Sequence, residues 1–293
     1  MLFFPIILMV LFYSFQSLFT RLYSSHYAGK DPAQAKSVFS VCYGVFIAGA
    51  SLVVGRFSFA PSWQTWLLGL LNAGMLVLYN TAIIEAGNRG SYSFLMIANM
   101  FGGILVPMAV GVLFLGETLT SLQVFAIALM LISLVVMNAR GISFKANQGA
   151  YYLWCLLLFL ANGLYGTLLN LQANVMHGSE RTEMLIILYL FSALAVIAAE
   201  AIRGRGPQLA QGFKMGKRAA LYLLICCASA TAAANLLMSI LPLMPSSILY
   251  TIDNGGVLTA SILYSLILFK ERPTWEQFLG MGTAVVSIVL INL

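Results

Sequence analysis

Long uninterrupted apolar segments are the feature that most limits how this chain can fold. Of its 293 residues, 61% are hydrophobic and 8% are charged, whereas a water-soluble domain carries about 25% charged residues. A helix of about 20 apolar residues crosses the roughly 30 Å hydrocarbon core of a bilayer. The sequence predicts ten such segments, at 2–23, 36–55, 64–86, 91–115, 120–138, 149–175, 182–203, 217–241, 246–269 and 274–293.

These segments predict an all-α integral membrane protein with ten transmembrane helices. They are continuous and lack the alternation of a membrane barrel strand, and in lipid a helix satisfies the backbone of such a segment. The connections are short, the longest lying around 203–217, so a soluble enzyme and a nucleic-acid-binding protein are excluded. The first segment lacks the basic start and the cleavage site of a signal peptide, and we expect it to be retained as a span.

Basic residues gather on one side of the predicted spans. The odd-numbered connections hold thirteen Lys and Arg residues, and the even-numbered ones hold Arg56 and Arg181. The thirteen are Arg21, Lys30, Lys36, Arg89, Arg140, Lys145, Arg203, Arg205, Lys214, Lys217, Arg218, Lys270 and Arg272. Short basic loops stay in the cytoplasm, so we expect a cell (inner) membrane protein with both termini outside the cytoplasm. The stretch 203–218 has the composition to contact anionic membrane lipids as well, although cytoplasmic retention is enough to explain its charge.

The second half of the chain repeats the first. At an offset of 154 residues, Ser93 to Asn138 aligns with Ser247 to Asn292, and a weaker match aligns 14–22 with 163–171. We therefore expect two five-helix repeats, residues 1–140 and 141–293. Because five is an odd number of spans, the repeats are predicted to be inverted relative to each other, which is typical of secondary transporters.

Each half closes with an apolar span, a glutamate, a short turn and a Thr-x-x-Gln helix start. The two segments are Gly116-Glu-Thr-Leu-Thr-Ser-Leu-Gln123 and Lys270-Glu-Arg-Pro-Thr-Trp-Glu-Gln277. Together with the duplication, this pattern resembles the EamA-type transporters of the drug/metabolite transporter superfamily, over the whole chain. The resemblance implies a ten-helix carrier that works by alternating access.

The glutamates of these segments, Glu117 and Glu271, have a structural interpretation. Both Thr-x-x-Gln segments have the spacing of a capping box, in which the Thr and Gln side chains each bond a backbone amide of the helix start. An acid beside such a start is stabilised by the positive end of the helix. We therefore expect both glutamates to support the fold rather than transport.

Asp253 is the acid that most favours a functional interpretation. It lies about seven residues into the ninth span, roughly 10 Å deep, where an unpaired carboxylate costs several kcal/mol. Its counterpart in the first half is Asn99, and each is followed three positions later by a glycine on the same helix face. We expect both residues to line a substrate site. The alternative is a glycine-assisted helix contact in which Asp253 bonds Asn99 or a tyrosine hydroxyl.

Further polar residues follow the faces of several spans. A polar stripe along an apolar helix faces protein or water and not lipid, although single asparagines also serve as contacts between membrane helices. We expect a central cavity bounded by spans one, three, four, six, eight and nine. Beside Asp253 and Asn99, its wall is predicted to contain Gln16, Tyr79, Asn80, Asn162, Tyr165 and Asn235.

One buried carboxylate among amides and tyrosines favours a small cationic or zwitterionic metabolite as substrate. Asp253 is equally suited to bind a coupling proton or ion. The chain has no nucleotide-binding or hydrolase motif, and its four cysteines lie inside spans, so we expect no enzyme activity, cofactor or metal. The sequence thus predicts a secondary active transporter of a small polar organic metabolite. The alternatives are a flippase for lipid-linked substrates and a non-transporting accessory membrane subunit.

The orientation can be tested by labelling from each side of the membrane. A cysteine introduced within 203–218 is expected to react with a membrane-impermeant thiol reagent only when the reagent has access to the cytoplasmic side, because basic connections are retained there. Labelling of this cysteine from outside intact cells would contradict the predicted orientation.

Overall fold

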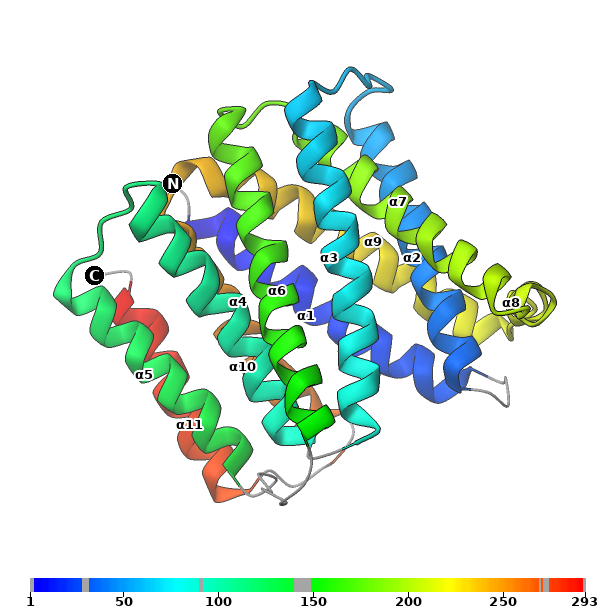
Figure 1. Cartoon of the computed structure of the whole chain (residues 1–293). Helices are drawn as coiled ribbons and strands as arrows, with labels where there is room; N and C mark the ends of the chain where they lie inside the picture. Colours follow the sequence, from blue (N-terminus) through cyan, green and yellow to red (C-terminus); the bar gives the residue numbers. More distant parts are fainter. Residues whose placement is uncertain are drawn as a thin grey trace. The chain divides into compact units, whose positions relative to one another are not determined.

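Within the residues that it describes, the structure is entirely helical. It is a computed structural model that describes residues 3–27, 32–89, 92–139, 149–268, 270 and 274–291. The helices, drawn in Figure 1, are α1 Phe3–His26, α2 Pro32–Val54, α3 Trp63–Gly87, α4 Tyr92–Phe114, α5 Ser121–Asn138, α6 Gly149–Val175, α7 Arg181–Ile202, α8 Gly206–Gly212, α9 Lys217–Ile240, α10 Ser246–Ile267 and α11 Trp275–Ile291, with a 3-10 turn at Leu241–Leu243.

Ten of these helices coincide with the predicted spans, and α8 is an additional short helix in the longest connection. The helix ends lie within four residues of the predicted ones. Seven of the described helices (α1, α2, α3, α4, α6, α7 and α9) are long and apolar enough to cross a membrane, while α5 and α11 are apolar but shorter. These properties indicate a multi-pass membrane protein.

The chain divides into two compact units, each of which is discontinuous in sequence. Unit 1 comprises Met1–Val77 and Gln172–Ile240, and unit 2 comprises Leu78–Leu171 and Leu241–Leu293. Each unit therefore combines helices from both halves of the chain, and α3 and α6 contribute to both units. These units are defined by helix packing, whereas the expected repeats, 1–140 and 141–293, are defined by sequence similarity.

In unit 1, α2 packs against α7 at a glycine. A Cβ atom on Gly44 would lie 2.6 Å from the Tyr189 carbonyl oxygen and 2.8 Å from the Ala193 Cβ. Directly after α2, Gly55 approaches Thr182, which precedes Ala193 in α7. The two helices are therefore antiparallel, and the missing side chain of Gly44 allows their backbones to approach closely.

A glutamate from the connection between α6 and α7 caps the start of α3. The Glu180 carboxylate accepts hydrogen bonds from the Ser62 backbone N–H at 2.9 Å and from the Ser62 hydroxyl at 2.8 Å. Burial opposes ionisation of Glu180, but the hydrogen bonds from Thr65 and Ser62 outweigh it and hold the pKa of Glu180 below its ordinary value. Three elements of unit 1 are thus joined at this connection.

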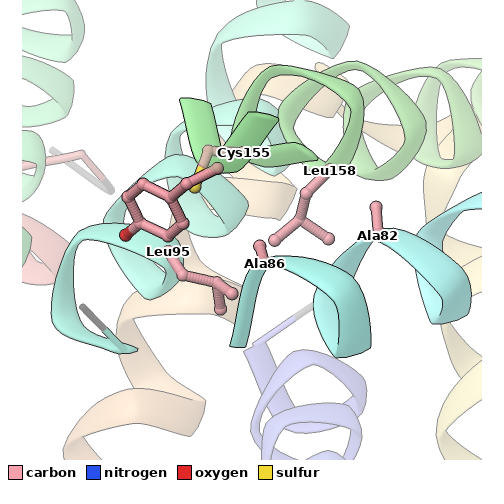
Figure 2. Close-up of a cluster of buried hydrophobic side chains, with 6 residues drawn as sticks. Ala82, Ala86, Leu95, Cys155 and Leu158 are labelled. Carbon is pink, nitrogen blue, oxygen red and sulfur yellow. The ribbon is translucent and has the colours of Figure 1, made fainter. Parts of the chain in front are cut away.

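In unit 2, the end of α3 meets α4 and α6 in a cluster of buried apolar side chains. Figure 2 shows Ala82 and Ala86 of α3, Leu95 of α4, and Cys155 and Leu158 of α6. Their side chains are all 3% exposed or less. The small side chains of the two alanines leave space beside α3, and the larger side chains of α4 and α6 fill it.

The α5 and α11 helices of unit 2 lie side by side (Figure 1) and make reciprocal contacts. The Ser133 hydroxyl of α5 donates to the Gly280 carbonyl of α11, and the Ser287 hydroxyl of α11 donates to the Ala126 carbonyl of α5, both at 2.6 Å. Residue numbers rise along α5 as those of their partners fall along α11, so the helices are antiparallel. The 154-residue offset relates Ser133 to Ser287 and Ala126 to Gly280. The two bonds are therefore equivalent, one donated by each helix, as across a two-fold axis.

We expect Gly44→Ala to destabilise the protein. Its Cβ would collide with the backbone of α7 at the Tyr189 carbonyl, and overpacking of this kind costs about 1–3 kcal/mol. Gly49→Ala in the same helix is the matched control, because a Cβ there meets nothing within 4 Å and alanine is the better helix former. Thermal unfolding in detergent should give a lower midpoint for Gly44→Ala alone. Equal midpoints for the two variants would contradict the close packing of α2 and α7.

Candidate functional site

The expected site residues divide between the two units. Six lie in unit 2 and two in unit 1. Those of unit 2 are Tyr79 and Asn80 on α3, Asn99 on α4, Asn162 and Tyr165 on α6, and Asp253 on α10; those of unit 1 are Gln16 on α1 and Asn235 on α9. Each group is described within its own unit.

Two side-chain amides of unit 2 meet over Gly103 of α4. The Asn162 Nδ2 of α6 donates a hydrogen bond to the Asn99 backbone carbonyl, at 2.8 Å. A Cβ atom on Gly103 would lie 2.9 Å from this Nδ2 and 3.5 Å from the Asn254 Nδ2 of α10. The Asn162 side chain therefore bonds the Asn99 backbone, and the missing side chain of Gly103 makes room for the Asn162 and Asn254 amides.

The neighbouring glycine, Gly102, serves a different purpose. A Cβ there would lie 2.1 Å from the Phe159 carbonyl oxygen of α6. On the facing side, a Cβ on Gly163 would lie 2.4 Å from the Val106 Cβ of α4. Gly102 and Gly163 thus allow the backbones of α4 and α6 to approach closely. This approach places Asn162 of α6 beside Asn99 of α4.

Asn254 lies beside Asn162 over Gly103, although sequence reasoning did not select it. Its Nδ2 donates to the Tyr250 carbonyl one turn earlier, at 2.8 Å. The signal that could have indicated it is an amide that directly follows Asp253 in an otherwise apolar segment. Its position over Gly103 depends on the packing of α4, α6 and α10 at one place. The spacing of residues along α10 does not predict that packing.

Tyr250 joins α10 to α6 by a hydrogen bond. Its hydroxyl donates to the Gly166 carbonyl at 2.8 Å, and its side chain is 6% exposed. A Cβ on Gly166 would lie 3.1 Å from the Tyr250 Cζ, so the glycine admits the ring. The hydroxyl that lies one turn before Asp253 is therefore directed to another helix.

Asp253 holds a buried acceptor atom that has no donor. Within the part of the chain that the structure describes, its Oδ1 has no hydrogen-bond partner, and neither does the Asn99 Oδ1. The sequences of α4, α5, α6 and α10 contain no Lys or Arg that could serve as a counter-ion. A buried carboxylate oxygen without a donor is costly, so this arrangement suits a proton or a ligand that supplies a hydrogen-bond donor or a positive charge.

The remaining predicted residues of unit 2 are half-buried. Tyr79 packs against the cluster of Figure 2, at the end of α3. Asn80 follows it on the same helix, and Tyr165 lies on α6 between Asn162 and Gly166. Tyr79 thus has a packing contact of its own, and Tyr165 lies next to the contacts that join α6 to α4 and α10.

In unit 1, Asn235 joins α9 to α2. Its Nδ2 donates to the Thr231 carbonyl at 2.9 Å and to the Ser51 hydroxyl at 3.5 Å, while its Oδ1 is buried with no partner among the described residues. Gln16 is half-buried on α1, and its backbone carbonyl accepts from the Thr20 hydroxyl at 2.8 Å. Asn235 therefore repeats the pattern of Asn99, a buried amide whose oxygen lacks a donor.

A carboxylate caps the start of α10 in unit 2. The Glu117 Oε1, from the connection between α4 and α5, accepts from the Ser246 backbone N–H at 2.9 Å and from the Ser246 hydroxyl at 2.8 Å. Its Oε2 accepts from the Ser247 hydroxyl at 3.1 Å, and Asn170 of α6 donates to Oε1 at 3.4 Å. The expected structural role of Glu117 is supported by these contacts, but the helix that it caps is α10 and not α5.

Both Thr-x-x-Gln segments form the predicted reciprocal hydrogen bonds. At α5, Gln123 N–H donates to the Thr120 hydroxyl oxygen and the Thr120 N–H donates to the Gln123 side chain, which is a complete capping box. The equivalent pair of bonds joins Thr274 and Gln277 at the start of α11. Glu271 lies outside the described residues.

Comparison with known proteins identifies a fold and no family. No family profile matches the chain, and no curated protein matches its sequence. By contrast, 29 chains of solved structures match. One crystal structure shares 15% sequence identity with a TM-score of 0.76, and the match covers 99% of this chain and 98% of that one. At this identity the likeness shows the fold alone.

We expect Glu117→Gln to destabilise the protein. The variant would keep the side-chain shape but place an NH2 group against donors at the start of α10, and a lost buried hydrogen bond to a charged group costs about 1.5–3 kcal/mol. Glu85→Gln is the matched control, because Glu85 is partly exposed near the end of α3 and pairs with Arg89, two residues beyond that helix, and such ion pairs contribute little. Thermal unfolding should show a lower midpoint for Glu117→Gln, and an unchanged midpoint would show that the cap is unimportant.

Proposed function

We propose that this chain is a secondary active transporter of a small polar organic metabolite, cationic or zwitterionic, that works by alternating access. The observation that carries the proposal is the Asp253 carboxyl, set in a helix of an apolar chain with a buried oxygen that lacks a donor. A polar group that costs stability in a membrane protein marks a functional site.

The buried acceptor atoms of unit 2 favour a ligand that donates hydrogen bonds. In unit 2, the Asn99 Oδ1 is a second buried acceptor without a donor, while the Asn162 NH2 is bonded to a backbone carbonyl. The surrounding helices supply no Lys or Arg, so a phosphate ester would find no cation here. An ammonium group could donate a hydrogen bond to either oxygen, and a coupling proton would neutralise the Asp253 carboxylate.

The packing within unit 2 supports the proposed inverted repeat. The expected repeat partners α4 and α10 pack together, as do α5 and α11. The reciprocal hydrogen bonds of Ser133 and Ser287 run between antiparallel helices that the 154-residue offset relates. Antiparallel partners related by a two-fold axis are what an inverted duplication produces. The sequence resemblance to EamA-type carriers of the drug/metabolite transporter superfamily is consistent with this arrangement. The proposal places the protein in the cell (inner) membrane with both termini outside the cytoplasm.

Ligand-induced thermal stabilisation tests the proposal. Purified protein is heated with a panel of cationic, zwitterionic, neutral and anionic metabolites, and the same panel is applied to Asp253→Asn. A ligand at 100 times its Kd stabilises the native state by about 2.7 kcal/mol. We expect a cation or zwitterion to raise the unfolding midpoint of the native protein and to have little effect on Asp253→Asn, which lacks the negative charge.

Glu85→Gln serves as the control for removal of one negative charge, since Glu85 lies at the exposed end of α3 in an ion pair with Arg89. It should respond to the panel as the native protein does. An equal response of Asp253→Asn would remove Asp253 from the binding site. A lipid-linked substrate is added as a further member of the panel. Stabilisation by this compound alone would favour a flippase, and a protein that binds no member of the panel would favour an accessory subunit.

A further inference from the structure

The connection between α7 and α9 is a fixed structural element in unit 1. It contains α8, whose Leu209 and Gly212 are buried. The Tyr27 hydroxyl donates to the Gly212 carbonyl at 3.1 Å, and the Gln34 side chain donates to the Gln208 carbonyl. A Cβ on Gly212 would lie 2.6 Å from a Val38 methyl group, so α8 packs tightly against the start of α2. Cytoplasmic retention of a loop requires positive charge but no such packing.

This element and the adjoining start of α2 carry several exposed positive charges. Arg205, Lys214, Lys217 and Arg218 are exposed, and Lys36 is exposed on the adjoining part of α2. Asp31, five residues before Lys36, lies outside the described residues. The acid that precedes Arg205 in the sequence is Glu200, which accepts from the Ser37 hydroxyl at 3.3 Å and lies 3.6 Å from Arg203. The sequence holds no further Asp or Glu before Asp253.

Apolar side chains are exposed among these cations. Ile202, at the end of α7, is 87% exposed, and Phe213, directly after α8, is 43% exposed. The flanking helices α7 and α9 are long and apolar enough to cross a membrane, so α8 lies where a spanning helix leaves the bilayer. Exposed apolar groups at this level contact acyl chains, while neighbouring Lys and Arg side chains reach the headgroup phosphates.

We infer that α8 and its flanking residues form a binding surface for anionic phospholipid, here called the α8 surface and defined by Lys36, Ile202, Arg205, Phe213, Lys214, Lys217 and Arg218. Two properties fit this partner together. The cations match the negative phosphodiester, and the apolar pair matches the chains attached to it, whereas a soluble anion would use the cations alone. The inference is independent of the transported substrate, because none of the expected site residues belongs to this surface.

Lipid titration of the full chain tests the α8 surface. Detergent-solubilised protein is titrated with equal amounts of phosphatidylglycerol and phosphatidylcholine, and bound lipid is counted by native mass spectrometry. The native protein should prefer phosphatidylglycerol. Lys214→Gln/Lys217→Gln is expected to reduce that preference by up to about 30-fold at low salt, since each basic residue beside an anionic membrane contributes roughly a fivefold factor.

Arg56→Gln/Arg181→Gln is the matched control, because it also removes two exposed positive charges of unit 1 but not from the α8 surface. It should keep the native preference. Equal loss in both double variants would assign the preference to net charge and overturn the inference, as would equal binding of the two lipids by the native protein. Displacement of phosphatidylglycerol by an equal concentration of glycerol phosphate would show a site for soluble anions instead.

Discussion

The absence of water from the hydrocarbon core governs this structure, because every polar group within a membrane helix must find its partner in the protein. Hydroxyl groups meet this requirement locally. Thr167, Thr231 and Thr251 each donate to the backbone carbonyl four residues earlier, at 2.7–2.8 Å. The partnerless oxygens of Asp253, Asn99 and Asn235 are among the buried acceptors that depart from this pattern, at an energetic cost. That cost is the physical reason for placing ligand chemistry beside them.

Close backbone approach is the second condition on which both units depend. Lipid chains are as apolar as the helix surfaces, so association of helices relies on van der Waals contact and hydrogen bonds rather than on exclusion of water. Gly44 supplies that approach between α2 and α7, and Gly102 and Gly163 supply it between α4 and α6. The latter crossing also positions Asn162 on the Asn99 carbonyl. Packing and the candidate site therefore share one set of small residues in unit 2.

Local properties of the chain could be predicted from its sequence, and contacts between helices could not. The helix positions follow from the length of each apolar segment, and the bonds of Thr120 with Gln123 follow from a spacing of three. The bond between Asn162 and Asn99, by contrast, depends on which helices pack together. The same holds for Glu117, which lies beside the start of α5 in sequence but caps α10 in space. Asn254 was missed for this reason: its place over Gly103 exists only where three helices meet.

The paired serine bonds of α5 and α11 have a mechanical consequence. Ser133 and Ala126 are separated by seven residues, about 10 Å along the helix axis, and each accepts or donates a bond to α11. Sliding by a single residue, or rotation of either helix about its own axis, would break both bonds at once. We therefore expect α5 and α11 to move as one body. A rearrangement of unit 2 would then change the contacts between this pair and the other helices and keep the contacts between α5 and α11.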